Sequence, residues 1–271
     1  MNNKNFGQKF LREYISQTPL ALTFERAQEC YLYPAENFVP KVLDFGCGDG
    51  IFGSITFKEK IDYGLDLNFR ELLSAKEKES YNNLINASGY SLPFQNQFFN
   101  TIISNSVIEH IPDLSCVLRE INRVLSPKGT FFLTIPTSKF DESPILYRIL
   151  NLFRFTKLKK IFKLQYNNFW KHYHYYSVQE WHEIFEKAGF SKIIFQTYES
   201  ENMAALNDAL VLLSGFNYVI KKITNRFVIS PKLREKFYSP FFSGLEKKMS
   251  GINKHKNEGV LLFCILKKVD K

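Results

Sequence analysis

Residues 41–50 read Lys41-Val42-Leu43-Asp44-Phe45-Gly46-Cys47-Gly48-Asp49-Gly50, and residues 63–67 read Tyr63-Gly64-Leu65-Asp66-Leu67. The short apolar run before Gly46 is typical of a buried parallel strand. The glycines after it allow the backbone to approach a ligand where a Cβ would collide. Helical periodicity resumes at Ile51, so the loop would open a helix whose free N–H groups attract a carboxylate or polar group. The stretch therefore predicts a strand, a nucleoside-binding loop and, over residues 61–65, a second strand that ends beside Asp66.

Two classes of nucleotide site fit these glycines. The spacing Gly48-x-Gly50-x-x-Gly53, with an acid downstream, satisfies the dinucleotide fingerprint. Asp44 argues against that class, because a carboxylate at the end of the strand would repel a diphosphate. The spacing Asp44-x-Gly46-x-Gly48-x-Gly50 instead resembles motif I of class I S-adenosylmethionine-dependent methyltransferases. The resemblance implies that Asp44 helps hold the amino group of S-adenosylmethionine, that the glycines lie under its methionine and ribose, and that Asp66 accepts hydrogen bonds from the ribose.

Further segments, in the family's own order, resemble its small-molecule (type 11-like) branch. They are Ser91–Asn100 (an "LPF…sFD" segment), Ser106–Asp113 (an "EH-hydrophobic-x-D" turn), Leu118–Thr130 (an amphipathic helix and glycine turn) and Tyr176–Phe190 (a helix leading to a sixth strand). Alternating strands and helices predict an α/β fold with a mostly parallel sheet covered on both faces. The resemblance adds that this is a Rossmann-like, doubly wound, seven-stranded sheet whose last strand, within 259–267, runs antiparallel.

The resemblance also implies a set of cofactor-binding residues. These are Asp44, Gly46, Cys47, Gly48, Asp66, Leu67, Ser88, Gly89, Asn105 and Ser106. Asn105 and Ser106 end the predicted fourth strand, where the methionine end of the cofactor would lie. Ser88 departs from the pattern, because the family usually has an acid there to bind the adenine amino group. The Ser88 hydroxyl or the backbone around Gly89 can still accept that hydrogen bond.

The basic charge of the chain is concentrated in two stretches. The formal net charge is +9, but residues 140–176 carry seven Lys or Arg against two acids, and residues 211–258 carry ten against three. The rest of the chain is therefore slightly acidic. Both basic stretches fall where the branch usually inserts substrate-recognition elements.

The sequence predicts one methyltransferase domain over residues 1–271, with N-terminal helices at 8–32 and cap insertions at 137–175 and 199–258. In the first insertion the apolar face shifts by about half a turn near Thr156, which predicts two short helices. In the second, a helix over 203–218 precedes a basic segment. The aromatic residues beside its charges are Phe237, Tyr238, Phe241 and Phe242.

Methyl transfer needs alignment of the two reactants and, for a hydroxyl nucleophile, a base. His110 is a candidate for that base. His174 is a second candidate, within an aromatic and imidazole cluster at 172–176 for which a packed lid is the favoured interpretation. The expected acceptor is a small, lipid-linked or glycan-linked molecule with anionic groups, and the basic, apolar helices also suit peripheral contact with an anionic membrane face.

Two alternatives remain open. A basic surface with Phe and Tyr is also expected of an RNA methyltransferase. A non-catalytic relative that binds the cofactor and acts as an interaction protein is the second alternative.

Other features predict a cytoplasmic protein without a metal centre. Residues 1–10 lack the apolar region of a signal peptide, and no apolar run approaches the length of a membrane span. Cys30, Cys47, Cys116 and Cys264 are widely spaced, and no histidine is placed to complete a zinc site.

Overall fold

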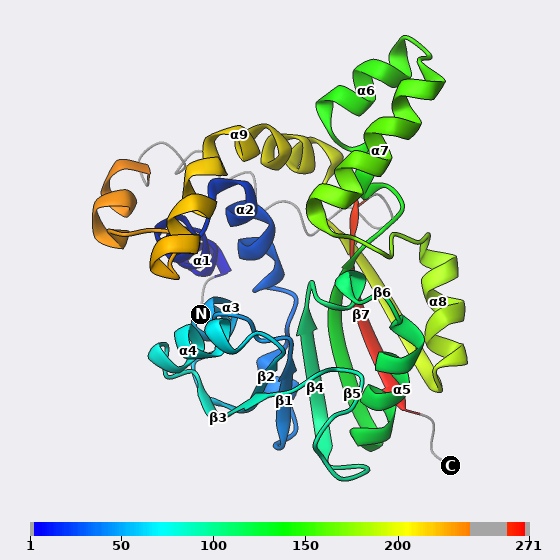
Figure 1. Cartoon of the computed structure of the whole chain (residues 1–271). Helices are drawn as coiled ribbons and strands as arrows, with labels where there is room; N and C mark the ends of the chain where they lie inside the picture. The colour runs from blue at the N-terminus through cyan, green and yellow to red at the C-terminus, as the bar shows by residue number, and fades with distance from the viewer. Residues whose placement is uncertain (1–2, 239–258, 269–271) are drawn as a thin grey trace.

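A computed structural model of the chain describes residues 3–238 and 259–268. These form one seven-stranded sheet with the order β3-β2-β1-β4-β5-β7-β6 (Figure 1). The strands are β1 Val42–Phe45, β2 Ile61–Asp66, β3 Tyr81–Asn86, β4 Phe99–Asn105, β5 Leu125–Pro136, β6 Phe190–Tyr198 and β7 Leu261–Lys268. β7 runs antiparallel to β5 and β6, and the pairs among β1 to β5 are parallel. The predicted Rossmann-like sheet with an antiparallel last strand is confirmed.

Neighbouring residues along the central strands point to opposite faces of the sheet. Leu43 and Ile102 join a core that also contains side chains of α5 (Leu114–Val124) and α8 (Val178–Lys187). Val42 and Ile103 join a second core with side chains of α4 (Phe69–Glu77). The sheet is therefore covered on both faces, as the continuous apolar strands require.

The N-terminal segment forms two helices, α1 (Asn3–Gln17) and α2 (Leu20–Glu29), and a short 3₁₀ turn, η1 (Ala35–Asn37), follows. α2 packs against α9 (Glu201–Thr224), and the backbone N–H of Ala21 donates to the Ser214 hydroxyl at 3.1 Å. A third apolar core joins α1, α2 and α9 to α3 (Ile51–Thr56), the helix that follows β1. This core holds the N-terminal helices over the glycine loop (Figure 1).

The insertion after β5 contains η3 (Phe140–Glu142), α6 (Ile145–Leu152) and α7 (Thr156–Trp170). The predicted break near Thr156 is confirmed, and Arg154 between the helices has a φ of 56°. α6 and α7 project away from the sheet (Figure 1). α9 continues beyond the predicted end at Tyr218 to Thr224, and residues 231–238 are also helical. Phe241 and Phe242 lie outside the described residues.

Among the described residues, no single helix is long and apolar enough to cross a membrane. The two parts of α9, Glu201–Val211 and Ser214–Thr224, meet the criteria of length and composition only as a pair, and they are bent by 62°.

Candidate functional site

The loop between β1 and α3 is built around glycines in the left-handed region. Gly46, Gly48 and Gly50 have φ values of 79°, 53° and 74°. The N–H groups of Gly46 and Cys47 both donate to the carbonyl of Leu65, at 2.8 and 3.0 Å, which ties the loop to β2. A Cβ added to Gly48 would meet no heavy atom of the described residues within 4 Å. The loop therefore presents bare backbone to open space, as a close ligand approach requires.

A cavity of about 460 Å³ lies over this loop. The predicted residues that line it are Asp44, Gly46, Cys47, Gly48, Asn105, Ser106 and His110. The residues that sequence reasoning missed come mainly from the surrounding helices and include Tyr14, Thr18, Leu22, Arg26, Lys221 and Phe227. The ends of β1 and β4 thus meet the N-terminal helices and α9 around one cavity.

Asp44 is a buried acid in the wall of this cavity. The Tyr81 hydroxyl donates to its Oδ2 at 2.7 Å. Burial raises the pKa of Asp44 to about 7, the charge of Asp66 adds to the rise, and the Tyr81 hydrogen bond opposes it. A cation bound beside Asp44 would favour its ionised form.

The other predicted cofactor residues lie outside the lining of this cavity, at the ends of β2 and β3. Asp66 accepts from the N–H of Gly48 at 2.9 Å and from that of Asn68 at 2.7 Å. Leu67, which follows it, is 72% exposed, so it offers an apolar surface beside the carboxylate. The Ser88 hydroxyl accepts from the N–H of Tyr90 at 3.2 Å. Gly89 packs against the ring of Phe45, which a Cβ would approach to 2.6 Å.

Glu29 of α2 is a hub that the sequence analysis did not find. Its Oε2 accepts from Arg26 at 2.7 Å and from Asn105 at 2.8 Å, and its Oε1 accepts from Tyr198 at 2.8 Å. Arg26 also donates to the Ser106 hydroxyl at 2.6 Å. These bonds join α2 to the carboxyl end of β4 and to the end of β6. The only sequence signal is an Arg–Glu pair at i, i+3, which is common on exposed helices.

Lys221 of α9 was also missed as a site residue. Its Nζ lies 3.1 Å from Asp49 in the glycine loop and 3.0 Å from Glu71 in α4. This lysine therefore neutralises two acids of the cavity, although it comes from an insertion whose charge suggested an acceptor-facing role.

A second cavity of about 250 Å³ lies between α2, α7 and α9. It shares Leu22, Arg26, Ser106 and His110 with the first, so the two cavities meet at these residues. Its further lining combines acids and aromatic groups, among them Glu25, Glu109, Tyr166, Trp170, His172, Glu199, Asp208 and Tyr218. Burial raises the pKa of Glu25, Glu199 and Asp208 and so favours the neutral form of these carboxyl groups. The lining of this cavity is therefore rich in carboxyl groups, although the insertions are basic overall.

The two predicted catalytic histidines occupy different positions. His110 lines both cavities, and burial lowers its pKa. His174 lines neither; its Nε2 lies 2.9 Å from the carbonyl of Ile111 and its Nδ1 lies 3.1 Å from the Tyr176 hydroxyl. Both ring nitrogens of His174 therefore lie within hydrogen-bond distance of groups of the fold, which favours a structural role for this residue.

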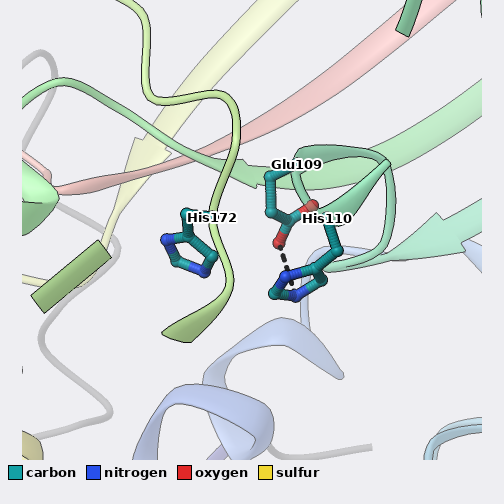
Figure 2. A group of neighbouring side chains, drawn as sticks. All are labelled: Glu109, His110 and His172. Atoms are coloured by element: carbon teal, nitrogen blue, oxygen red, sulfur yellow. Dashed lines mark ion pairs between the residues drawn. The ribbon is translucent and has the colours of Figure 1, made fainter. Parts of the chain in front are cut away.

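A third histidine joins His110 at the second cavity. Figure 2 shows His172 beside Glu109 and His110. One possible ligand atom of each residue lies within 4.8 Å of the others. No metal centre was expected from the sequence, because these residues have no recognisable ligand spacing along the chain. The fold brings them together from two separate segments.

Comparison with known proteins supports the resemblance found in the sequence. A family model described as "Methyltransferase domain" matches residues 8–193. A malonyl-[acyl-carrier protein] O-methyltransferase of Legionella pneumophila is 31% identical over 126 residues, which cover 44% of this chain and 43% of that protein. A demethylmenaquinone methyltransferase of Staphylococcus haemolyticus is 26% identical over 183 residues, which cover 58% of this chain and 71% of that protein. The match thus spans less than half of the Legionella relative.

Solved structures share the fold at low sequence identity. A S-adenosylmethionine-dependent methyltransferase of Thermotoga maritima, described as a possible histamine N-methyltransferase, aligns with a TM-score of 0.56 and 16% identity over 99% of this chain and 100% of that one. A phosphoethanolamine N-methyltransferase 2 of Haemonchus contortus, in complex with S-adenosylhomocysteine, aligns with a TM-score of 0.53 and 16% identity over 90% of this chain and 53% of that one.

Proposed function

We infer the function from one premise: this chain belongs to the methyltransferase domain family. It is a methyltransferase whose cofactor is S-adenosylmethionine. We propose that the methyl group passes by in-line displacement to a small-molecule, lipid-linked or glycan-linked acceptor in the cavity between α2, α7 and α9. The observation that carries this proposal is the meeting of that cavity with the one over the glycine loop, at Arg26, Ser106 and His110.

The residues around the glycine loop fit the cofactor. When bound, S-adenosylmethionine supplies an electrophilic methyl group on a sulfonium. The bare backbone at Gly48 leaves room for a close approach, and the buried carboxylate of Asp44 suits a cationic amino group. Asp66 holds Gly48 in place and offers further acceptor capacity to a ribose. Leu67 offers an exposed apolar surface for an adenine ring.

The acceptor cavity contributes alignment and exclusion of water. His110 reaches both cavities, which supports it over His174 as the histidine that faces the reacting groups. The named relatives, acting on malonyl-[acyl-carrier protein] and demethylmenaquinone, support an acceptor that is small or attached to a carrier or lipid. We place any anionic groups of the acceptor at the basic outer surface of the insertions, because the interior of the cavity is lined by acids.

The proposed function is tested by incubating the protein with labelled S-adenosylmethionine and fractionated cell extract. We expect the label to enter a small-molecule, lipid or glycan fraction. Label in RNA, together with salt-sensitive RNA binding, would instead support an RNA methyltransferase. Tight binding of S-adenosylhomocysteine without label in any fraction would support a non-catalytic, partner-binding relative.

Asp66→Ala is expected to weaken cofactor binding by about 1 to 3 kcal/mol, through lost ribose hydrogen bonds and a freed Gly48 N–H. Calorimetric titration with S-adenosylhomocysteine measures the change. Asp62→Ala is the matched control, because Asp62 accepts from the N–H groups of Lys41 and Val42, each at 2.8 Å, at the opposite end of the same strands. Equal loss of affinity in both variants would contradict a ribose contact for Asp66.

Cofactor affinity should rise with pH through the titration of Asp44. The pKa of Asp44 in the free protein is about 7, so the carboxyl is mostly protonated at pH 6 and ionised at pH 8. Because the cofactor's ammonium favours the ionised form, affinity for S-adenosylhomocysteine should increase by about tenfold between these values. Asp44→Asn should bind more weakly and abolish this increase. An unchanged pH profile in Asp44→Asn would contradict the assigned ammonium contact.

The same titration affects folding with a definite sign. Between about pH 4 and pH 7 the folded protein keeps a proton on Asp44 that the unfolded chain has released. The contribution of Asp44 to the free energy of unfolding therefore falls as the pH rises from about 4 to about 7.

We further propose that α6 and α7 rest on an anionic membrane surface. Apolar side chains are exposed on both helices and between them, including Leu152 (77%) on α6, Phe153 (63%) after it and Leu164 (62%) on α7. Lys157 and Lys160 are exposed on α7. An exposed apolar surface flanked by lysines is typical of interfacial helices.

Replacing both Lys157 and Lys160 with glutamine should weaken binding to vesicles that contain phosphatidylserine, by about 1 kcal/mol for each lysine. Cofactor affinity should stay unchanged. Lys163 is left intact, because it pairs with Asp141 and Glu142 at 2.9 Å and supports the fold. Vesicle binding equal to that of the wild type would contradict membrane contact through these lysines.

A further inference from the structure

Glu109, His110 and His172 form a cluster at the wall of the acceptor cavity (Figure 2). Glu109 and His110 belong to η2 (Ile108–His110), the turn after β4, and His172 follows α7. The rings of His110 and His172 are 5.0 Å apart between centroids, and Oε1 of Glu109 lies 3.8 Å from Nε2 of His110. The cluster therefore combines two imidazoles and one carboxylate from two segments of the chain.

The orientation of His110 aims a lone pair at Glu109. Its Nδ1 lies 3.1 Å from the carbonyl oxygen of Lys171, which can only accept a hydrogen bond. Nδ1 must therefore carry the proton and donate, which leaves Nε2 of the neutral ring with a lone pair. A lone pair that faces a carboxylate oxygen at 3.8 Å is unfavourable unless a proton or a metal cation lies between them. A backbone carbonyl that orients the second nitrogen is also a common support for metal-binding histidines.

Two further polar atoms of the cluster have no partner in the described part of the chain. They are Oε2 of Glu109 and Nδ1 of His172, and both are buried. A buried acceptor without a partner costs about 1 to 3 kcal/mol. A metal ion would satisfy several of these groups together.

The backbone holds the cluster in place before any ligand arrives. The N–H groups of Tyr173 and His174 both donate to the carbonyl of Glu109, at 2.9 and 3.3 Å. The N–H of His172 donates to the carbonyl of Asn167 at the end of α7, at 2.9 Å. The segment that carries His172 is thus tied directly to the residue it faces.

The surrounding charge also favours a cation. Glu25, Glu29 and Glu199 are buried or largely buried near the cluster, and the cations that act on it are Arg26 and Lys171. Arg26 is already paired with Glu29 at 2.7 Å and lies 3.7 Å from Glu25. Further positive charge would offset the cost of the remaining carboxylates.

We propose that Glu109, His110 and His172 bind a first-row divalent cation such as Zn²⁺ or Mn²⁺. Two imidazoles and a carboxylate suit such ions, and three protein ligands leave positions open toward the acceptor cavity. Ligand atoms about 2.1 Å from a metal lie roughly 3 to 3.5 Å from one another. The possible ligand atoms of this cluster lie within 4.8 Å of one another, so small side-chain rotations would bring them to these distances. The ion would anchor an oxygen or nitrogen atom of the acceptor, and His110 would act as a ligand and not as a free base. Only this anchoring role rests on the proposed function; binding of the ion does not.

The test is titration of the chelator-treated full chain with Mn²⁺, Zn²⁺ or Co²⁺, without cofactor or acceptor. We expect one ion per chain by calorimetry and a visible absorption spectrum with Co²⁺. His172→Ala and Glu109→Gln should each lower the affinity by at least about tenfold. His182→Ala is the control, because His182 lies on α8, outside the cluster, and pairs with Glu186 at 3.4 Å. This variant should bind the ion as the wild type does.

A second measurement locates the ion without substitution. Mn²⁺ should broaden the ring-proton NMR signals of His110 and His172 before those of His182. The proposal is overturned if the wild type binds no ion in a one-to-one ratio, if His182 is broadened first, or if a folded His172→Ala variant binds as tightly as the wild type. Binding of S-adenosylhomocysteine is measured separately, so failure of the metal site and failure of the methyltransferase assignment give different results.

Discussion

Gly46→Ala is expected to lower cofactor affinity by more than tenfold, with a loss of stability. Gly46 has a φ of 79°, and an L-residue in this left-handed region costs about 1 to 2 kcal/mol. Its Cβ would also lie 2.5 Å from both Cγ atoms of Val107. Overpacking of this kind costs about 1 to 3 kcal/mol. The loop must therefore move away from the end of β4, and both parts line the cofactor cavity.

Calorimetry with S-adenosylhomocysteine and thermal unfolding measure the two effects. Gly215→Ala in α9 is the matched control, because the described residues place no heavy atom within 4 Å of its Cβ. Alanine at this helical position should stabilise the fold by about 0.5 to 1 kcal/mol. Adding Val107→Ala to Gly46→Ala removes the overlapping Cγ atoms, so it should restore part of the affinity and leave the φ strain. Wild-type affinity in Gly46→Ala would show that the loop position is unimportant for binding.

The features that could be predicted from the sequence are those encoded locally. The run from Val42 to Gly50 contains its own strand, turn and helix start, and each depends on residues a few positions apart. The break at Thr156 is similarly local, because the phase of an apolar face changes within one segment. The antiparallel last strand followed from family resemblance.

The features that could not be predicted depend on long-range packing. Arg26 and Glu29 gain their role only when α2 meets the ends of β4 and β6. His172 joins Glu109 and His110 through backbone bonds between distant segments. Net charge was also misleading about the interior, because lysines such as Lys157 and Lys160 are exposed while buried acids such as Glu199 line the acceptor cavity.

Glu29→Ala is expected to reduce the free energy of unfolding by about 3 to 5 kcal/mol, because it leaves the charge of Arg26 without its closest partner. The Glu29 side chain is fully buried and accepts hydrogen bonds from Arg26, Asn105 and Tyr198. The midpoint of thermal unfolding should fall by roughly 6 to 20 °C. Glu77→Ala is the control, because its pair with Arg226 at 2.8 Å is exposed and worth about 0 to 1 kcal/mol.

The double variant Arg26→Met, Glu29→Leu separates stability from function. Replacing both charges with apolar groups should recover part of the lost stability, because the charge of Arg26 is no longer left without Glu29. The recovery is incomplete, because Asn105 and Tyr198 still lose their acceptor. The double variant also removes the contact between Arg26 and Ser106, where the two cavities meet. We therefore expect a protein that is more stable than Glu29→Ala but has a weaker cofactor affinity and slower methyl transfer than the wild type. Recovery of stability and activity together would mean that the hydrogen bonds of Glu29 only hold α2 in place. A Glu29→Ala variant that melts at the wild-type temperature would show that these bonds do not stabilise the fold.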